Sequence, residues 1–296
     1  GPDPASINAA MIGGIAANNA SGMCCGTSQN SYRTVSSMRI ILHDGTLLDT
    51  ADPHSRKSFY KSHPKLVADI ENLGRKVKEN SVLADRIRRK FKIKNTTGYS
   101  LNALVDYDDP LDIIMHLMIG SEGTLGFISE IVYNTVVEHP YKASALMIFP
   151  NIENACSAAA VLTLAPVAAA EIMDRASLRS VEDNEGIPSY IKTLSATATA
   201  LLVETRAYTT EELRINIGKI IQSLEGIETA RPLEFTEIEA QYTTLWNIRK
   251  GLFPAVGAVR TIGTTVIIED IAVPVESLGD CLLELQKLFV KYDYRN

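Results

Sequence analysis

Apolar residues in the first half of the chain follow two periods, one typical of strands and one typical of helices. Met38, Ile40 and Leu42 alternate with other residues, and the turn pair Asp44-Gly45 comes next, which predicts a β-hairpin over residues 35–50. After Pro64 the apolar residues recur at spacings of three and four, which favours helices. We expect helices over 64–77, 82–91 and 110–118, and a strand over 127–137.

The pattern changes at His139-Pro140, which we take as a domain boundary. Beyond it, helices alternate with strands that need not be parallel, and this predicts an α+β sandwich of the split βαβ type. The expected strands cover residues 145–149, 168–173, 197–204 and 264–268. The expected helices cover 152–164, 210–224, a segment around 246–250, and 275–292.

Composition narrows the class of protein. The 296 residues are 46% hydrophobic and 22% charged, as in globular proteins, and the net charge of −6 argues against a general nucleic-acid binder. We find no secretory signal and no apolar run long enough for a membrane helix, so we expect no membrane span. The four cysteines lack C-x-x-C spacing, which argues against a zinc or iron–sulfur site carried by this chain alone and favours a cytoplasmic location.

The two ends of the chain suggest an internal fragment of a longer protein. The sequence opens at Gly1-Pro2-Asp3-Pro4 without an initiator methionine, and it closes just after an expected amphipathic helix. We therefore expect further segments of the same protein on both sides.

Residues 54–94 form a basic segment between two expected sheet regions. They hold 13 Lys and Arg against four Asp and Glu. Such a charge excess is typical of a solvated helix face, and it also fits a docking or steering surface for an acidic substrate or partner. The sequence leaves both interpretations open.

Two glycine-rich segments are candidates for binding. Residues 10–26 are small and nearly uncharged, so their backbone can lie close against another surface, either protein or ligand. The segment GSEGTLG has glycines at 120, 123 and 126, and it matches neither a Rossmann turn nor a phosphate-binding P-loop. Its backbone N–H groups suit a flat or anionic ligand, although an ordinary tight turn would look the same.

Several strings recur here in one order: GGIAANNASG from Gly13, then Thr97-Gly98-Tyr99, then GSEGTLGFISE from Gly120. In this order the chain resembles flavoproteins of the vanillyl-alcohol-oxidase type. It is most similar to the branch of FAD-linked D-2-hydroxyacid dehydrogenases that includes D-lactate dehydrogenase, the glycolate oxidase flavin subunit and D-2-hydroxyglutarate dehydrogenase. LWNIRK at 245–250 and EDIAVP at 269–274 resemble strings of that family's cap domain.

The resemblance implies a fold and a cofactor. Residues 1–138 would be the second half of an FAD-binding domain, with the basic segment as a helical insertion, and 139–296 would be a ferredoxin-like α+β cap domain truncated at its C-terminus. FAD would lie along the two glycine-rich segments, because main-chain N–H groups bind phosphate and flavin oxygens without burying a side-chain charge. The implied cofactor-binding residues are Gly13, Gly14, Ala17, Asn18, Asn19, Gly22, Gly26, Tyr32, Gly120, Glu122, Gly123, Gly126 and Ile128.

The implied reaction is oxidation of a small D-2-hydroxyacid to a 2-oxoacid by hydride transfer to the flavin. Trp246 and Arg249 share one helix face, and in the family this arginine binds the substrate carboxylate; a surface arginine covering Trp246 is the alternative. Lys250 and Arg260 are weaker candidates. Ile268 stands where a related branch of the family has a lysine, so that lysine's contact with the substrate does not carry over. Glu269 and Asp270 are adjacent, and adjacent residues of a strand point to opposite faces, so their carboxylates cannot bind one group together.

The sequence also lacks groups that such a reaction needs. The histidines at 43, 54, 63, 116 and 139 have no zinc spacing, so we expect no metal site, and we find no candidate for the base that takes the hydroxyl proton. We therefore expect this chain alone to bind FAD weakly or not at all and to be inactive. The electron acceptor stays open, with an iron–sulfur module elsewhere in the protein compatible with the family, and so does a homodimer. A non-catalytic assembly module that uses the incomplete flavin half-site as an interaction surface is the competing hypothesis.

Overall fold

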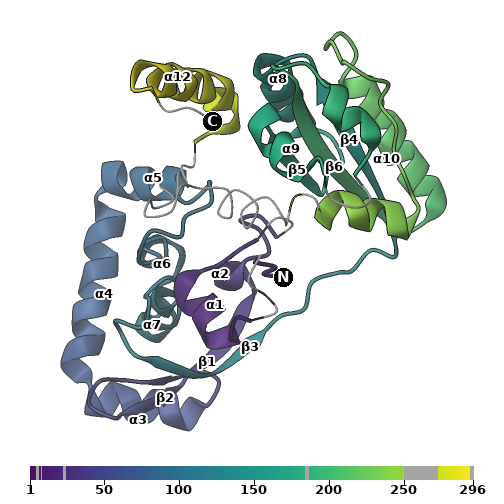
Figure 1. Cartoon of the computed structure of the whole chain (residues 1–296). Coiled ribbons are helices and arrows are strands. Elements are labelled where there is room, and N and C mark those ends of the chain that lie inside the picture. The colour runs from purple at the N-terminus through teal and green to yellow at the C-terminus, as the bar shows by residue number, and fades with distance from the viewer. Residues whose placement is uncertain are drawn as a thin grey trace. The chain divides into compact units, whose positions relative to one another are not determined.

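The structure is a computed structural model, and it describes residues 1–4, 7, 9–22, 25–183, 187–247, 249 and 273–293. The chain forms two compact units, Gly1–Val137 and Glu138–Asn296. Each unit combines a small antiparallel sheet with helices (Figure 1), so the fold is α+β, as the sequence predicts. Over the described ranges, no helix is long and apolar enough to cross a membrane.

Unit 1 is built on a three-stranded sheet with the order β2-β1-β3. The strands are β1 (Val35–Ile41), β2 (Leu47–Asp49) and β3 (Phe127–Tyr133). The antiparallel pairing of β1 with β2 confirms the predicted hairpin. Strand β3 is shorter than predicted: β1 begins at Val35, which pairs with Tyr133, and the last bond between the two segments runs from the N–H of Asn134 to the carbonyl of Thr34 at 2.7 Å.

Seven helices surround this sheet in the described part of unit 1. Three of them begin at a proline, and the side chains of Asp52, Asn80 and Asp109 accept hydrogen bonds from backbone N–H groups at helix starts. Each such cap is worth about 1 kcal/mol, which explains why the sequence marks these starts well. The helices are α1 (Ile12–Asn18), α2 (Ser31–Thr34), α3 (Pro53–Ser62), α4 (Pro64–Glu79), α5 (Ser81–Lys90), α6 (Ala103–Asp106) and α7 (Pro110–Met118).

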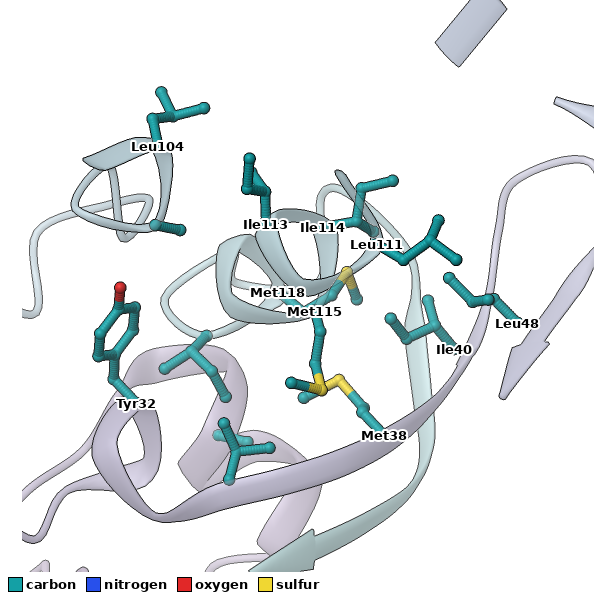
Figure 2. Packing of buried hydrophobic residues seen from close by; sticks show 14 of the residues in the cluster. Tyr32, Met38, Ile40, Leu48, Leu104, Leu111, Ile113, Ile114, Met115 and Met118 are labelled. Atoms are coloured by element: carbon teal, nitrogen blue, oxygen red, sulfur yellow. The ribbon is translucent and has the colours of Figure 1, made fainter. Parts of the chain in front are cut away.

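Helix α7 lies in the middle of the core of unit 1. Its buried side chains, among them Leu111, Met115 and Met118, pack near Ile40 and Leu48 of the sheet (Figure 2). An apolar helix that is buried on nearly all sides holds its own ends firmly in place. The C-terminal end of α7 leads directly into Gly120, so this core fixes the position of the second glycine-rich segment.

The basic segment folds as α3, α4, α5 and the start of the connection that follows α5. Ion pairs attach it to the rest of unit 1. Arg56 binds Asp109 at 2.7 Å and Asp112 at 3.0 Å, and Lys78 binds Asp108 and the carbonyl of Tyr107. A first group of its cations therefore has a structural role.

Unit 2 has a three-stranded sheet with the order β4-β6-β5. The strands are β4 (Tyr141–Phe149), β5 (Ala169–Met173) and β6 (Thr199–Ala207), and β6 is antiparallel to both of its neighbours. Strands β4 and β5 therefore run parallel with β6 between them, which is the predicted split βαβ arrangement. Helices α8 (Ile152–Leu162) and α10 (Thr210–Ser223) pack on one face, against Met147 and Leu201 among others.

Strand β6 is buried along almost its whole length, so both faces of this sheet are covered. The remaining elements are α9 (Arg175–Val181), η1 (Ser189–Thr193), a helical segment at 239–247, η2 (Val275–Ser277) and α12 (Leu278–Lys291). The predicted helix at 275–292 thus divides into a 3-10 turn and an α-helix. The predicted strand at 264–268 lies outside the described residues.

Candidate functional site

The two glycine-rich segments lie side by side in unit 1. The last turn of α1 offers its carbonyl groups to the second segment: the N–H of Gly120 donates to Ala16 at 3.2 Å, and the N–H of Glu122 donates to Ala17 at 2.9 Å. The Asn18 side chain donates to the Glu122 carboxylate at 2.7 Å. Segments about 100 residues apart in the sequence therefore form one continuous surface.

Close backbone packing explains two of the predicted glycines. Gly120 has a φ of 86°, and a Cβ on it would lie 2.5 Å from the carbonyl oxygen of Gly98. Gly22 has a φ of 95°, and a Cβ there would lie 2.2 Å from the carbonyl oxygen of Asp3. These two glycines serve protein packing, because no side chain fits in either place.

Other predicted glycines face open space. A Cβ on Gly14, Gly26 or Gly123 would meet no atom within 4 Å, and one on Gly13 would touch only the carbonyl of Ile128 at 3.6 Å. Their backbone is accessible to a ligand, as a cofactor-binding wall requires. Gly126 instead packs on the sheet, where a Cβ would lie 2.9 Å from a β1 carbonyl.

Each of the two segments carries a buried polar atom without a partner in the described part of the structure. Asn19 is 6% exposed and Ser121 is 1% exposed, and neither Asn19 Oδ1 nor Ser121 Oγ has a hydrogen-bond partner there. The Asn19 amide nitrogen already donates to the carbonyl of Asn95, so the oxygen is the free end. Buried polar groups are normally satisfied, so these two atoms indicate a missing polar group or water.

Tyr32 points into the core of unit 1. It is 3% exposed, and its hydroxyl donates to Asp106 at 2.9 Å. Burial and the nearby Asp106 carboxylate raise the pKa of this phenol well above its usual range. Its ring also meets the ring of His116 edge-on at 5.0 Å. The side chain of Tyr32 is thus part of the packed interior of unit 1.

In unit 2, one face of the sheet carries a polar network under the helical segment 239–247. The Trp246 indole N–H donates to Ser144 Oγ at 3.1 Å, and Ser144 donates to the buried carboxylate of Glu204. Arg206 also donates to Glu204, at 2.6 Å. This network fixes Trp246, which is 7% exposed, against β4.

Arg249 comes one helical turn after Trp246 and faces the same sheet. Its Nε donates to Glu171 Oε2 at 3.0 Å, and Glu171 lies on β5. Among the described residues, no acceptor is bonded to the two Nη groups of Arg249, and the side chain is 32% exposed. With respect to the described residues, the guanidinium therefore has a fixed orientation and an edge whose donors can bind a planar acceptor.

A groove adjoins this network. Its volume is about 670 Å³, within the size range of small-molecule sites. Ser144 and Leu146 of β4 line it, together with residues from 231–245. Arg231 and Tyr190 also line this groove, and the guanidinium carbon of Arg231 lies 3.9 Å from the centre of the Tyr190 ring.

Sequence reasoning missed the groups that orient these residues. Nothing marked Glu171 as the partner of Arg249, although an acidic residue within an apolar strand was a signal. Gly98 stands in one of the quoted strings, but its contact with Gly120 needs the folded chain. Lys250, Arg260 and 268–270 lie outside the described residues. No group of three or more metal-ligating side chains occurs in the described ranges.

The comparisons with known proteins identify the family. Residues 138–296 match the model "FAD linked oxidases, C-terminal domain", and residues 1–51 match the model "FAD binding domain". The first match covers more than half of the chain, which therefore belongs to the FAD linked oxidase family. The resemblance seen in the sequence is confirmed, and so is FAD as the cofactor.

Curated relatives are distant and much longer. The chain is 26% identical over 198 residues to a mitochondrial D-lactate dehydrogenase [cytochrome] of Arabidopsis thaliana, covering 66% of this chain and 31% of that protein. It is 25% identical over 217 residues to glycolate oxidase subunit GlcD of Bacillus subtilis, covering 71% and 40%. The matches thus span 31% and 40% of the length of these relatives.

A solved structure of alkyldihydroxyacetonephosphate synthase is similar in fold. The TM-score is 0.60 at 15% identity, and the match covers 98% of this chain and 48% of that one. At this identity the similarity supports the fold alone.

Proposed function

We propose that this chain is part of an FAD-dependent dehydrogenase or oxidase that converts a D-2-hydroxyacid into a 2-oxoacid. The observation that carries the substrate class is Arg249, whose Nε is bonded to Glu171 while its Nη groups have no recorded partner among the described residues. A carboxylate binds such an edge through two parallel hydrogen bonds. The D-lactate dehydrogenase and glycolate oxidase relatives point to the same class.

The proposed cofactor wall consists of the two glycine-rich segments of unit 1. Gly13, Gly14, Ala17 and Asn18 would offer backbone on one side, and Glu122 and Gly123 on the other. Asn19 Oδ1 would accept a hydrogen bond from FAD, and the Ser121 hydroxyl would accept or donate one. When bound, FAD supplies the acceptor for the hydride.

The residues of unit 2 would hold the substrate. Arg249 would fix its carboxylate, and Trp246 would keep the helix in place through Ser144. The groove of about 670 Å³ has room for the rest of a hydroxyacid larger than lactate. We expect the base that takes the hydroxyl proton to come from another part of the protein.

Substitution of Arg249 tests this proposal in the FAD-loaded, full-length protein. Glycolate, D-lactate and D-2-hydroxyglutarate are offered with an artificial dye as the acceptor. Hydrogen bonds to a charged group contribute about 1.5–3 kcal/mol, so Arg249→Ala should lower kcat/KM roughly 10- to 100-fold, mainly through KM. Arg214→Ala, on the exposed face of α10, is the matched control. Equal KM values for the two variants would remove Arg249 from the substrate site.

A flavin absorption spectrum separates the enzyme from an assembly module. We expect bound flavin in the longer protein and little or none in residues 1–296. A full-length protein without flavin would favour the non-catalytic module. The cytoplasmic location, an iron–sulfur module and a homodimer stay predictions.

A further inference from the structure

The cations of the basic segment fall into two groups. Those with partners are Arg56, Lys65, Arg75, Lys78 and Arg88, and each forms an ion pair with an aspartate or glutamate. Those without a recorded ion pair in the described part of the chain are Lys57, Lys61, Lys76, Arg86, Arg89, Lys90, Lys92 and Lys94. The last five are exposed and lie close together within residues 86–94, which we call the basic run. Structural ion pairing therefore does not account for the charge of this run.

The apolar residues of the basic run point inward. Ile87 is 7% exposed and packs in the core of unit 1, and Phe91 packs against that core as a partly buried residue. Ile93 is also partly buried. The run thus presents cations outward without apolar side chains to insert into a lipid bilayer, which favours a polar, anionic partner surface.

The end of the basic run reaches the proposed cofactor wall. The carbonyl of Asn95, one residue after Lys94, accepts the hydrogen bond from Asn19 at the end of α1. Phe91, Ile93 and Asn95 also line the same small cavity as Asn19. An acceptor protein bound at this run would therefore lie next to the wall where FAD is proposed to bind.

We propose that the basic run docks an acidic electron-acceptor protein. This inference rests on the proposed oxidation, which needs an electron acceptor. Each hydroxyacid that is oxidised releases two electrons and two protons. The electrons pass to the acceptor protein, and the protons go to solvent. Transient electron-transfer interfaces are small, and opposite charges accelerate their formation 10- to 1,000-fold at low salt. The matching partner carries a cluster of carboxylates near its redox centre.

The test compares two charge reversals in the FAD-loaded, full-length protein. Lys92→Glu with Lys94→Glu changes the basic run beyond the last residue of α5 and leaves the cations within the helix in place. Lys57→Glu with Lys61→Glu makes the same change on α3, at the other end of α4 (Figure 1), and neither of these lysines has a recorded ion pair in the described structure. The two pairs of substitutions lie at opposite ends of helix α4, whose 16 residues span about 24 Å. This separation exceeds the screening length of about 8 Å at physiological salt, so each pair changes the charge of its own surface.

The acceptors are cytochrome b5, which is acidic, cytochrome c, which is basic, and an uncharged dye. We expect the substitution at 92 and 94 to lower the rate with cytochrome b5 at least 10-fold at low salt and to flatten its salt dependence. The control pair should change that rate less than twofold, and both variants should keep the dye-linked rate. Equal losses in the two variants, or no loss in either, would overturn the proposal. Lys92→Gln with Lys94→Gln replaces the first variant if it fails to fold.

Two further outcomes separate this proposal from its alternatives. If the wild-type protein oxidises no hydroxyacid with the dye, the proposed function fails, and calorimetric titration with cytochrome b5 then tests docking alone. Vesicles with 30% phosphatidylserine test a membrane surface. Salt-dependent binding to them that is lost in the variant, without any effect on cytochrome b5, would assign the basic run to a membrane and overturn the proposal.

Discussion

The contact between Gly120 and Gly98 gives a quantitative prediction about the cofactor wall. Replacing Gly120 with alanine forces an L-residue to a φ of 86°, which costs about 1–2 kcal/mol. The new Cβ would lie 2.5 Å from the Gly98 carbonyl oxygen, so the backbone must also shift, at about 1–3 kcal/mol more. We expect the free energy of unfolding to fall by roughly 2–5 kcal/mol.

Two neighbouring glycines separate these contributions. Gly123 has a φ of 74° but no atom near its missing Cβ, so Gly123→Ala should cost only about 1–2 kcal/mol. Gly14 lies within α1 and also faces open space, so Gly14→Ala should stabilise the chain by up to about 1 kcal/mol. Urea unfolding of the 296-residue chain, followed by far-UV circular dichroism, measures all three. A Gly120 variant no less stable than the Gly123 variant would refute the packing argument.

Two more predictions concern the stability of unit 1. Burial lowers the pKa of His116, whose Nδ1 bonds a backbone carbonyl, so its folded pKa lies below that of the unfolded chain, about 6.5. The contribution of neutral His116 to the free energy of unfolding is therefore complete above about pH 6.5 and declines as the pH falls below it. Urea unfolding should show a smaller loss of stability between pH 7 and pH 5 in His116→Gln than in the wild type. Arg56→Ala breaks two ion pairs of a half-buried guanidinium and should cost about 1–3 kcal/mol, whereas Arg75→Ala, in an exposed pair, should cost less than about 0.5 kcal/mol. Limited proteolysis within α3 and α4 checks the second prediction, and equal cleavage rates in the two variants would contradict it.

Local signals made most elements predictable from the sequence. Pro64 and Asp109-Pro110 mark helix starts, alternating apolar residues mark β1, and a continuous apolar run marks β6. These signals depend on neighbours within one or two turns, so they need no knowledge of the fold. The sequence also indicated the two glycine-rich segments as candidate binding segments, because runs of small, uncharged residues let the backbone approach another surface closely.

Long-range contacts were not predictable in the same way. Residues 12–18 form a helix although glycines disfavour one, because Ile15 and Ala16 are buried there and the helix end bonds to the segment at 120–122. The role of Tyr32 as a cofactor contact stays a prediction, and the bond from its hydroxyl to a carboxylate 74 residues away could not be seen in the sequence. The orientation of Arg249 depends on Glu171 in the same way. Each of these depends on a partner that only folding brings near.

The position of the basic segment in the chain has an evolutionary consequence. It follows β2, at one edge of the sheet, and precedes β3, at the opposite edge, in the sequence. Its exposed charges without an ion pair can therefore change without altering the register of any strand, since β1 keeps both of its neighbours. If the basic run docks the electron acceptor as proposed, a lineage can exchange one redox partner for another by substitutions in this single stretch, and the proposed cofactor wall need not change.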